Sequence, residues 1–178
     1  MTDIPLPSQR GWGAWPGTSQ QAVAAFESSF IVTIHPLAKR PDVALRVHRD
    51  VAAPVAHLLQ HIETLHDLNR QADDWGFAVR PNRNAPSSPS WHSWGIAVDV
   101  DAADNPNGAT TTTLQPADRI RAAAHALGFR WGLDYHGTKD PMHFEYCGTR
   151  TDAQYCTWFM AQTPATQARN PRPYSFGG

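Results

Sequence analysis

Two short segments restrict the possible folds of this chain more than any other feature of its sequence. Residues 95–101 read GIAVDVD and residues 141–147 read PMHFEYC, and in both segments apolar and polar side chains alternate. Because successive side chains of a β-strand point to opposite faces, each segment predicts a strand with one apolar face for the core. The opposite face carries Asp99 in the first strand and His143 in the second. If the two strands are neighbours in one sheet, these two side chains converge.

A third metal-binding side chain reaches the same place. His92 lies in the loop that leads into the first predicted strand. Two imidazoles and one carboxylate are a common ligand set for catalytic zinc, which keeps a fourth position for water. The sequence therefore predicts a zinc site formed by His92, Asp99 and His143.

Other residues near the predicted site have more than one interpretation. Gly95 would let the backbone turn closely beneath the metal. Asp101 and Glu145 share the polar faces of the two strands, where they either orient the ligand histidines or simply face solvent. His57 and His61 are four residues apart, but their segment, HLLQH, lacks the glutamate that a helical two-histidine zinc motif supplies as a base. We therefore do not expect His57 and His61 to bind metal.

The motifs around the predicted ligands resemble a known family. Residues 90–99, SWHSWGIAVD, and residues 139–146, KDPMHFEY, are together similar to the D-alanyl-D-alanine carboxypeptidase and L-alanyl-D-glutamate endopeptidase group of zinc peptidases. The resemblance covers roughly residues 76–147 and includes GFRWGLDYHGT, in which WGLDY departs from the more usual Trp-Gly-Gly pattern. It implies a fold shared with the hedgehog signalling domain.

The resemblance also implies roles for individual residues. By position in the motifs, His92, Asp99 and His143 would be the zinc ligands, and Asp140, three residues before the last ligand, would be the general base. Enzymes of this group also use an arginine upstream of the first ligand to bind the substrate carbonyl or carboxylate. Arg80 and Arg83 are both candidates for this catalytic role, and the sequence leaves the choice between them open.

The rest of the chain predicts an α+β domain with a small antiparallel sheet flanked by helices. We expect an N-terminal arm at 1–25, the zinc peptidase domain at 26–162 and a C-terminal tail or linker at 163–178. Hydrophobic periodicity and start signals predict helices at 19–30, 51–69, 116–129 and 152–162, and further strands at 30–37 and 76–80. Residues 81–90, PNRNAPSSPS, are expected to form a loop.

Composition excludes several classes of partner. The chain has 15 basic and 16 acidic residues and no basic run, so we expect no nucleic acid partner. Its longest apolar runs, such as FIVTI, are far shorter than the roughly 20 residues of a membrane helix, so we expect no membrane insertion. The two cysteines, Cys147 and Cys156, form no CxxC pattern and are expected to be reduced packing residues. We also expect a monomer.

Together, these features predict a zinc-dependent peptidoglycan peptidase that hydrolyses an amide bond in the stem peptide or cross-bridge. The first residues show no secretory signal pattern, so we expect a protein made in the cytoplasm that acts on the bacterial cell wall, as a bacteriophage endolysin does. An exported D-alanyl-D-alanine carboxypeptidase is the first alternative. A metal-bearing binding module without catalysis is the second, although such a module has no need of Asp140 as a base.

Overall fold

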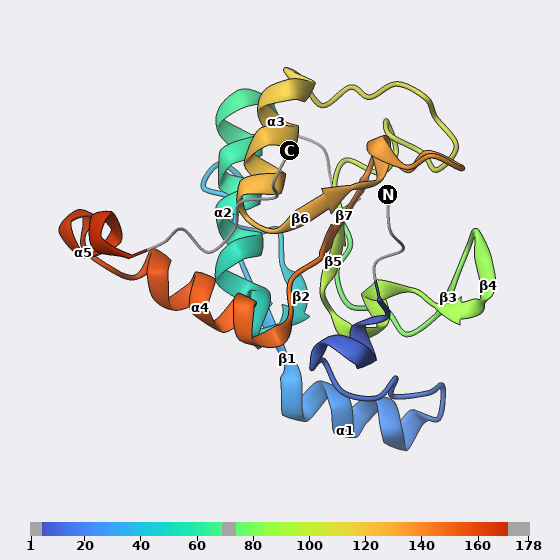
Figure 1. Ribbon diagram of the computed structural model, residues 1–178. Helices are drawn as coiled ribbons and strands as arrows, with labels where there is room; N and C mark the ends of the chain where they lie inside the picture. Colours follow the sequence, from blue (N-terminus) through green and yellow to red (C-terminus); the bar gives the residue numbers. More distant parts are fainter. Residues whose placement is uncertain (1–4, 69–73, 171–178) are drawn as a thin grey trace.

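The structure is a computed structural model, and it describes residues 5–68 and 74–170. It confirms the α+β class (Figure 1). The helices and strands are, in chain order, α1 (Gln20–Phe30), β1 (Ile31–Ile34), β2 (Leu45–His48), α2 (Ala52–Leu65), β3 (Pro81–Asn82), β4 (Ala85–Pro89), β5 (Ala97–Asp99), α3 (Ala117–Ala126), β6 (Phe129–Trp131), β7 (His143–Tyr146), α4 (Arg150–Met160) and α5 (Pro164–Arg169). Short 3₁₀ helices cover Pro7–Arg10, Arg49–Val51, Trp91–Trp94 and Gly132–Asp134.

The central sheet has three antiparallel strands in the order β5, β7, β6. Asp99 on β5 is directly opposite His143 on β7, and Ala97 is opposite Glu145. The two segments with alternating side chains are therefore neighbours, which was the condition for their polar side chains to converge. This register brings Asp99 and His143 together on one face of the sheet.

Helices cover the sheet and bury its apolar face. Figure 1 shows α2 and α3 side by side along one side of the central sheet, whereas the β3–β4 hairpin projects from the opposite side. The apolar residues of α2 recur at helical spacing and therefore form a stripe on one face of the helix, and this stripe is fully buried. The stripe consists of Val55, Leu58, Leu59 and Ile62. It meets the buried side chains of the sheet in one core, which holds the strands in place.

Position 95 requires glycine for two reasons, its left-handed backbone and the close approach of neighbouring strands. Gly95 ends the 3₁₀ helix Trp91–Trp94 with a left-handed φ of 68°. A Cβ on Gly95 would lie 2.7 Å from the backbone nitrogen of His48 and 2.8 Å from Ile31 Cδ1. The close approach that requires glycine is therefore to β1 and β2. Gly95 also forms the expected turn, because its amide donates to the carbonyl of His92.

Several segments differ from the sequence-based prediction. Residues 76–80 form no strand, because their backbone contacts do not extend into a ladder. Phe77 donates to the carbonyl of Arg46 on β2, and Ala78 donates to the carbonyl of His92. Residues 81–90 are mostly an antiparallel hairpin, β3–β4, instead of a loop. The helix predicted over 51–69 ends at Leu65, and position 69 lies outside the described residues.

Both termini contribute ordered elements to the described part of the chain. Within the expected arm, Trp12 is 2% exposed and packs edge-on against His48 and Tyr146. Within the expected tail, residues Pro164–Arg169 form α5. Cys147 and Cys156 are both free and buried, as expected.

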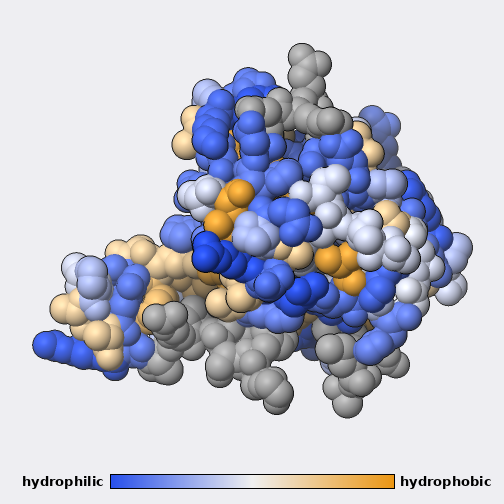
Figure 2. Space-filling model, turned by 90° about the horizontal axis from the view of Figure 1, so that it is seen from above, coloured by the Kyte–Doolittle hydropathy of each residue, from blue (hydrophilic) through white to orange (hydrophobic). Residues whose placement is uncertain are grey.

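Among the helices in 5–68 and 74–170, none combines the length and the apolar character that crossing a bilayer requires. On the face seen in Figure 2, hydrophobic residues form small, separate patches among hydrophilic ones.

Candidate metal centre

Three elements bring the three predicted ligands to one point. Asp99 ends β5, His143 begins β7, and His92 lies in the 3₁₀ helix Trp91–Trp94 just before β5. All three residues are buried. Asp99 Oδ1 lies 3.1 Å from His92 Nε2 and 2.8 Å from His143 Nδ1, and the two imidazole nitrogens are 3.1 Å apart. The structure therefore brings together the donor atoms that the sequence predicted.

Hydrogen bonds on the outer sides of the imidazoles determine which nitrogens face inward with a lone pair. His92 Nδ1 lies 2.7 Å from the carbonyl oxygen of Gly76, to which it donates. His143 Nε2 lies 3.3 Å from the carboxylate of Glu145 and donates to it. In these tautomers the inner nitrogens of both histidines carry lone pairs, as metal ligands require. Three acceptor atoms then face one another, an arrangement that calls for a cation among them.

The dimensions and charge of this cluster fit a divalent metal. Ligand atoms about 2.0–2.2 Å from a tetrahedral zinc lie roughly 3.3–3.6 Å apart, and the observed separations of 2.8–3.1 Å are a few tenths of an ångström shorter. Burial opposes ionisation of Asp99, but the two imidazoles beside it hold its pKa well below the usual range. Burial likewise opposes protonation of His143, yet the hydrogen bonds that it donates to the carboxylates of Asp99 and Glu145 raise its pKa to about 10. The cluster thus favours a positive charge at its centre, which a metal ion would supply.

A second group of side chains holds the imidazole of His143 through Nε2, the nitrogen that faces away from Asp99. Glu145 is 3% exposed, and it accepts hydrogen bonds from His143 and from the guanidinium of Arg130. The Arg130 guanidinium lies 4.8 Å from the ring centre of Tyr135. Sequence alternation put Glu145 on the face of His143, and the structure shows that it orients the ligand. Arg130 and Tyr135 were not predicted, because nothing in their local sequence indicates this contact.

Asp140 lies in the segment that leads into β7 and faces the same cleft as the three ligands. Its backbone is held by a hydrogen bond to the Gly132 carbonyl, and its own carbonyl accepts from the His143 amide. Gly132 allows this close approach, since a Cβ there would collide with Asp140. Burial raises the pKa of Asp140, and its Oδ1 has no hydrogen-bond partner within the described residues. The carboxylate is therefore held in place, in part by a hydrogen bond with Asn107, while its Oδ1 is left to exchange a proton.

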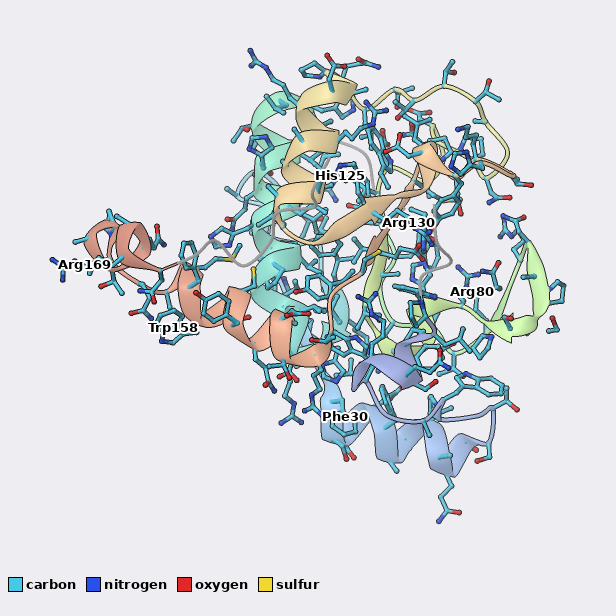
Figure 3. All side chains as sticks on the ribbon, viewed as in Figure 1. Phe30, Arg80, His125, Arg130, Trp158 and Arg169 are labelled. Carbon is cyan, nitrogen blue, oxygen red and sulfur yellow. The ribbon has the colours of Figure 1, made fainter. Side chains whose placement is uncertain are left out.

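The two candidate arginines occupy different positions in the same cleft. A terminal nitrogen of Arg80 lies 3.8 Å from Asp99 Oδ2, and the side chain is 40% exposed. Arg83 is exposed at the turn of the β3–β4 hairpin and also lines the cleft. Figure 3 shows Arg80 between the central sheet and the β3–β4 hairpin. Arg80 is thus the guanidinium beside the ligand cluster, and Arg83 reaches the cleft from farther out.

The cleft is large for a site with a buried centre. It has a volume of about 1120 Å³, whereas clefts that bury a drug-sized ligand typically measure roughly 300–1,000 Å³. Its walls come from the hairpin, the 3₁₀ helix before β5, and the two loops that follow β5 and β6. The ligand cluster lies within this cleft, where a substrate can reach it.

Other candidate residues are not part of this centre. Within the described ranges, His92, Asp99 and His143 are the only group of at least three side chains close enough to hold a metal, so His57 and His61 are not in one. Asp101 has a left-handed φ of 50°, and its carboxylate lies 3.6 Å from His66. Asp101 organises its own loop, in which its carboxylate accepts hydrogen bonds from Asn105 and Thr113.

A buried His–Asp–His cluster that shares a wide cleft with a further carboxylate is compatible with a metal-dependent hydrolase. Comparison with known families agrees with this class. The sequence model of the D-alanyl-D-alanine carboxypeptidase family matches residues 83–146 of the chain. The match confirms the resemblance and includes all three clustered residues and Asp140, although it begins after Arg80. It supports a peptidase of the kind that acts on peptidoglycan. No solved structure matches the chain significantly.

Proposed function

We propose that this chain is a zinc-dependent peptidase that hydrolyses an amide bond in peptidoglycan. The observation that carries the proposal is the cluster of three potential ligand atoms, one each from His92, Asp99 and His143, within 3.1 Å of one another. Such a set of two nitrogens and one oxygen leaves one position of a tetrahedral zinc for water or substrate. Zinc bound there would polarise the scissile carbonyl and lower the pKa of its water to about 7.

Asp140 is proposed as the general base and acid of this reaction. Its unpartnered Oδ1 can accept the proton of the attacking water and then deliver it to the leaving amine. The other carboxylates of the cleft are already engaged, because Asp134 is bound by Arg121 and Glu145 by Arg130. Asp140 is therefore the carboxylate best suited to move a proton here.

Arg80 is proposed to stabilise the oxyanion that develops on the scissile carbonyl. Its guanidinium is already next to Asp99, and more than a third of its side chain remains accessible to a substrate. A fixed positive charge at this position stabilises the transition state more than the ground state, because negative charge grows on the carbonyl oxygen during attack. Arg83, at the hairpin turn, is proposed to contact a substrate carboxylate farther from the metal.

Cleavage within a longer peptide is the form of the reaction that we favour. A dipeptide would fill only part of a cleft of about 1120 Å³, whereas a stem peptide or cross-bridge would use more of it. We therefore propose an endopeptidase of the endolysin type. Release of terminal D-alanine is the second candidate, and the description of the matching family favours it.

Digestion of purified peptidoglycan with the zinc-loaded chain tests the proposal. An endopeptidase should release new amino groups and soluble fragments, which mass spectrometry assigns to a particular amide bond. Free D-alanine as the only product, with all cross-links intact, would favour the carboxypeptidase instead. An unchanged digest that includes neither product would refute a peptidase acting on this substrate.

A further inference from the structure

Trp75 is an exposed aromatic side chain inside the cleft of the proposed active site. It is 59% exposed and lines the same cleft as His92 and Asp99. Single exposed apolar residues are common on protein surfaces and need no explanation there. An exposed indole within a substrate cleft is different, because a ligand that enters the cleft can cover its face.

The backbone holds Trp75 in a fixed position relative to the ligands. Its amide donates to the carbonyl of Asp99 at 2.9 Å, and the amide of Asp99 donates back to Trp75 at 2.8 Å. The carbonyl of the next residue, Gly76, accepts the hydrogen bond from His92 Nδ1. Phe77 then pairs with the backbone of Arg46 on β2. This local order means that a ligand can use the indole without first having to immobilise its backbone.

Trp75 also marks one end of the cleft. Strand β5 pairs with β7 on one side and with Trp75 on the other, so Trp75 and the β6 residue Arg130 lie on opposite sides of the ligand cluster. The other cleft residues that follow β5 are uncharged and small, and they include Ala102, Ala103 and Pro106. This end therefore suits an uncharged group that offers a flat face to the indole.

We propose that Trp75 forms a saccharide subsite, which receives a sugar ring of the glycan strand while the attached peptide lies across the metal centre. This inference rests on the proposed function and extends its substrate class to sugar-bearing peptides. The face of an indole is electron-rich and attracts the positively polarised C–H bonds on the face of a sugar ring. Peptidoglycan peptides carry carboxylates, whereas the N-acetylated sugars are uncharged, so the sugar is the part of the polymer that best fits this end.

Two substrates that differ only in the sugar test the subsite. The first is a disaccharide-linked stem peptide, and the second is the same peptide without sugar. The wild-type chain should have the higher kcat/KM for the sugar-bearing substrate. Trp75→Ala should reduce the ratio of the two kcat/KM values roughly five- to tenfold, the effect expected from loss of one aromatic stacking contact. Trp75→Phe should retain part of the preference.

Trp158 provides a matched control, since it is 43% exposed on α4, away from Arg80 and Arg130 (Figure 3). Trp158→Ala should leave the ratio unchanged. Zinc content should be equal in all variants, which shows that Asp99 is undisturbed. A ratio for Trp75→Ala within about twofold of the wild-type value would overturn the subsite. An equal loss on both substrates would also overturn it, since Trp75 would then contact the peptide.

Glycan strands stripped of peptide separate this inference from the proposed function. Calorimetric titration of the full chain should show binding that Trp75→Ala weakens by a similar factor. A chain that binds these strands through Trp75 but cuts neither peptide would support the subsite and refute the peptidase. A chain that cuts both peptides but binds the stripped strands no better than Trp75→Ala does would support the peptidase and refute the subsite.

Discussion

Replacing Asp140 with asparagine separates proton transfer from metal binding. The substitution keeps the size of the side chain and removes its basicity. Because the other carboxylates that line the cleft are bound by Arg121, by Arg130 or within the ligand cluster, no neighbour can replace Asp140. The full contribution of a general base should therefore be lost, which is ~10²- to 10⁴-fold in kcat, or about 3–5 kcal/mol in the barrier.

The assay is the initial rate of stem-peptide hydrolysis by zinc-loaded protein, with zinc measured in the same samples. The Asp140→Asn variant should contain as much zinc as the wild type and should unfold at the same urea concentration. Asp134→Asn is the matched control, since Asp134 lines the same cleft and is bound by Arg121, and its kcat should change less than about threefold. A variant of Asp140 that keeps more than a tenth of the wild-type kcat, or that loses zinc, would refute this role.

Four further substitutions test the roles of other residues. Arg80→Ala should lower kcat by roughly 10²-fold, as loss of an oxyanion-stabilising group does, whereas Arg83→Ala should mainly raise KM; steady-state kinetics with the opposite pattern would exchange the two roles. Glu145→Gln should weaken zinc affinity roughly 10- to 100-fold, measured by competition with a chelator, because the support of a ligand histidine is lost. His48 is fully buried, and burial lowers its pKa to about 4, so as the pH falls the unfolded chain takes up a proton first and stability is lost between about pH 6.5 and 4. Over this pH interval the free energy of unfolding, measured with urea, should fall by about 3 kcal/mol less in His48→Phe than in the wild type. Equal decreases in the two proteins would show that the pKa of His48 is not lowered by folding.

The clustering of His92, Asp99 and His143 could be predicted from sequence because it depends on local periodicity and a local motif. The alternation in β5 and β7 determines which face each side chain takes, and a short distance between the two faces follows once the strands are neighbours. The motif around His92 then supplied the third ligand. The residues that support the site were harder to find, because Arg130 comes from a strand of three residues directly after a helix, too short for periodicity to reveal.

The secondary structure of the cleft wall could not be predicted from sequence, because its segments do not follow their local composition. Residues 81–90 contain three prolines and several serines and asparagines, which normally indicate a loop, yet they form the β3–β4 hairpin. Conversely, residues 76–80 have the composition of a strand, but Gly76 packs directly on the backbone of Arg46 and the segment is left without a regular ladder. In both cases tertiary contacts outweigh local preference.

Anomalous X-ray scattering from crystals of the zinc-loaded chain, recorded at the zinc absorption edge, tests the central claim most directly. The account predicts one strong peak about 2.0–2.2 Å from each of His92 Nε2, Asp99 Oδ1 and His143 Nδ1. It also predicts that Gly76 and Glu145 remain bonded to the outer nitrogens of the two histidines. The absence of a peak among these three atoms, or coordination through the outer nitrogens, would contradict it.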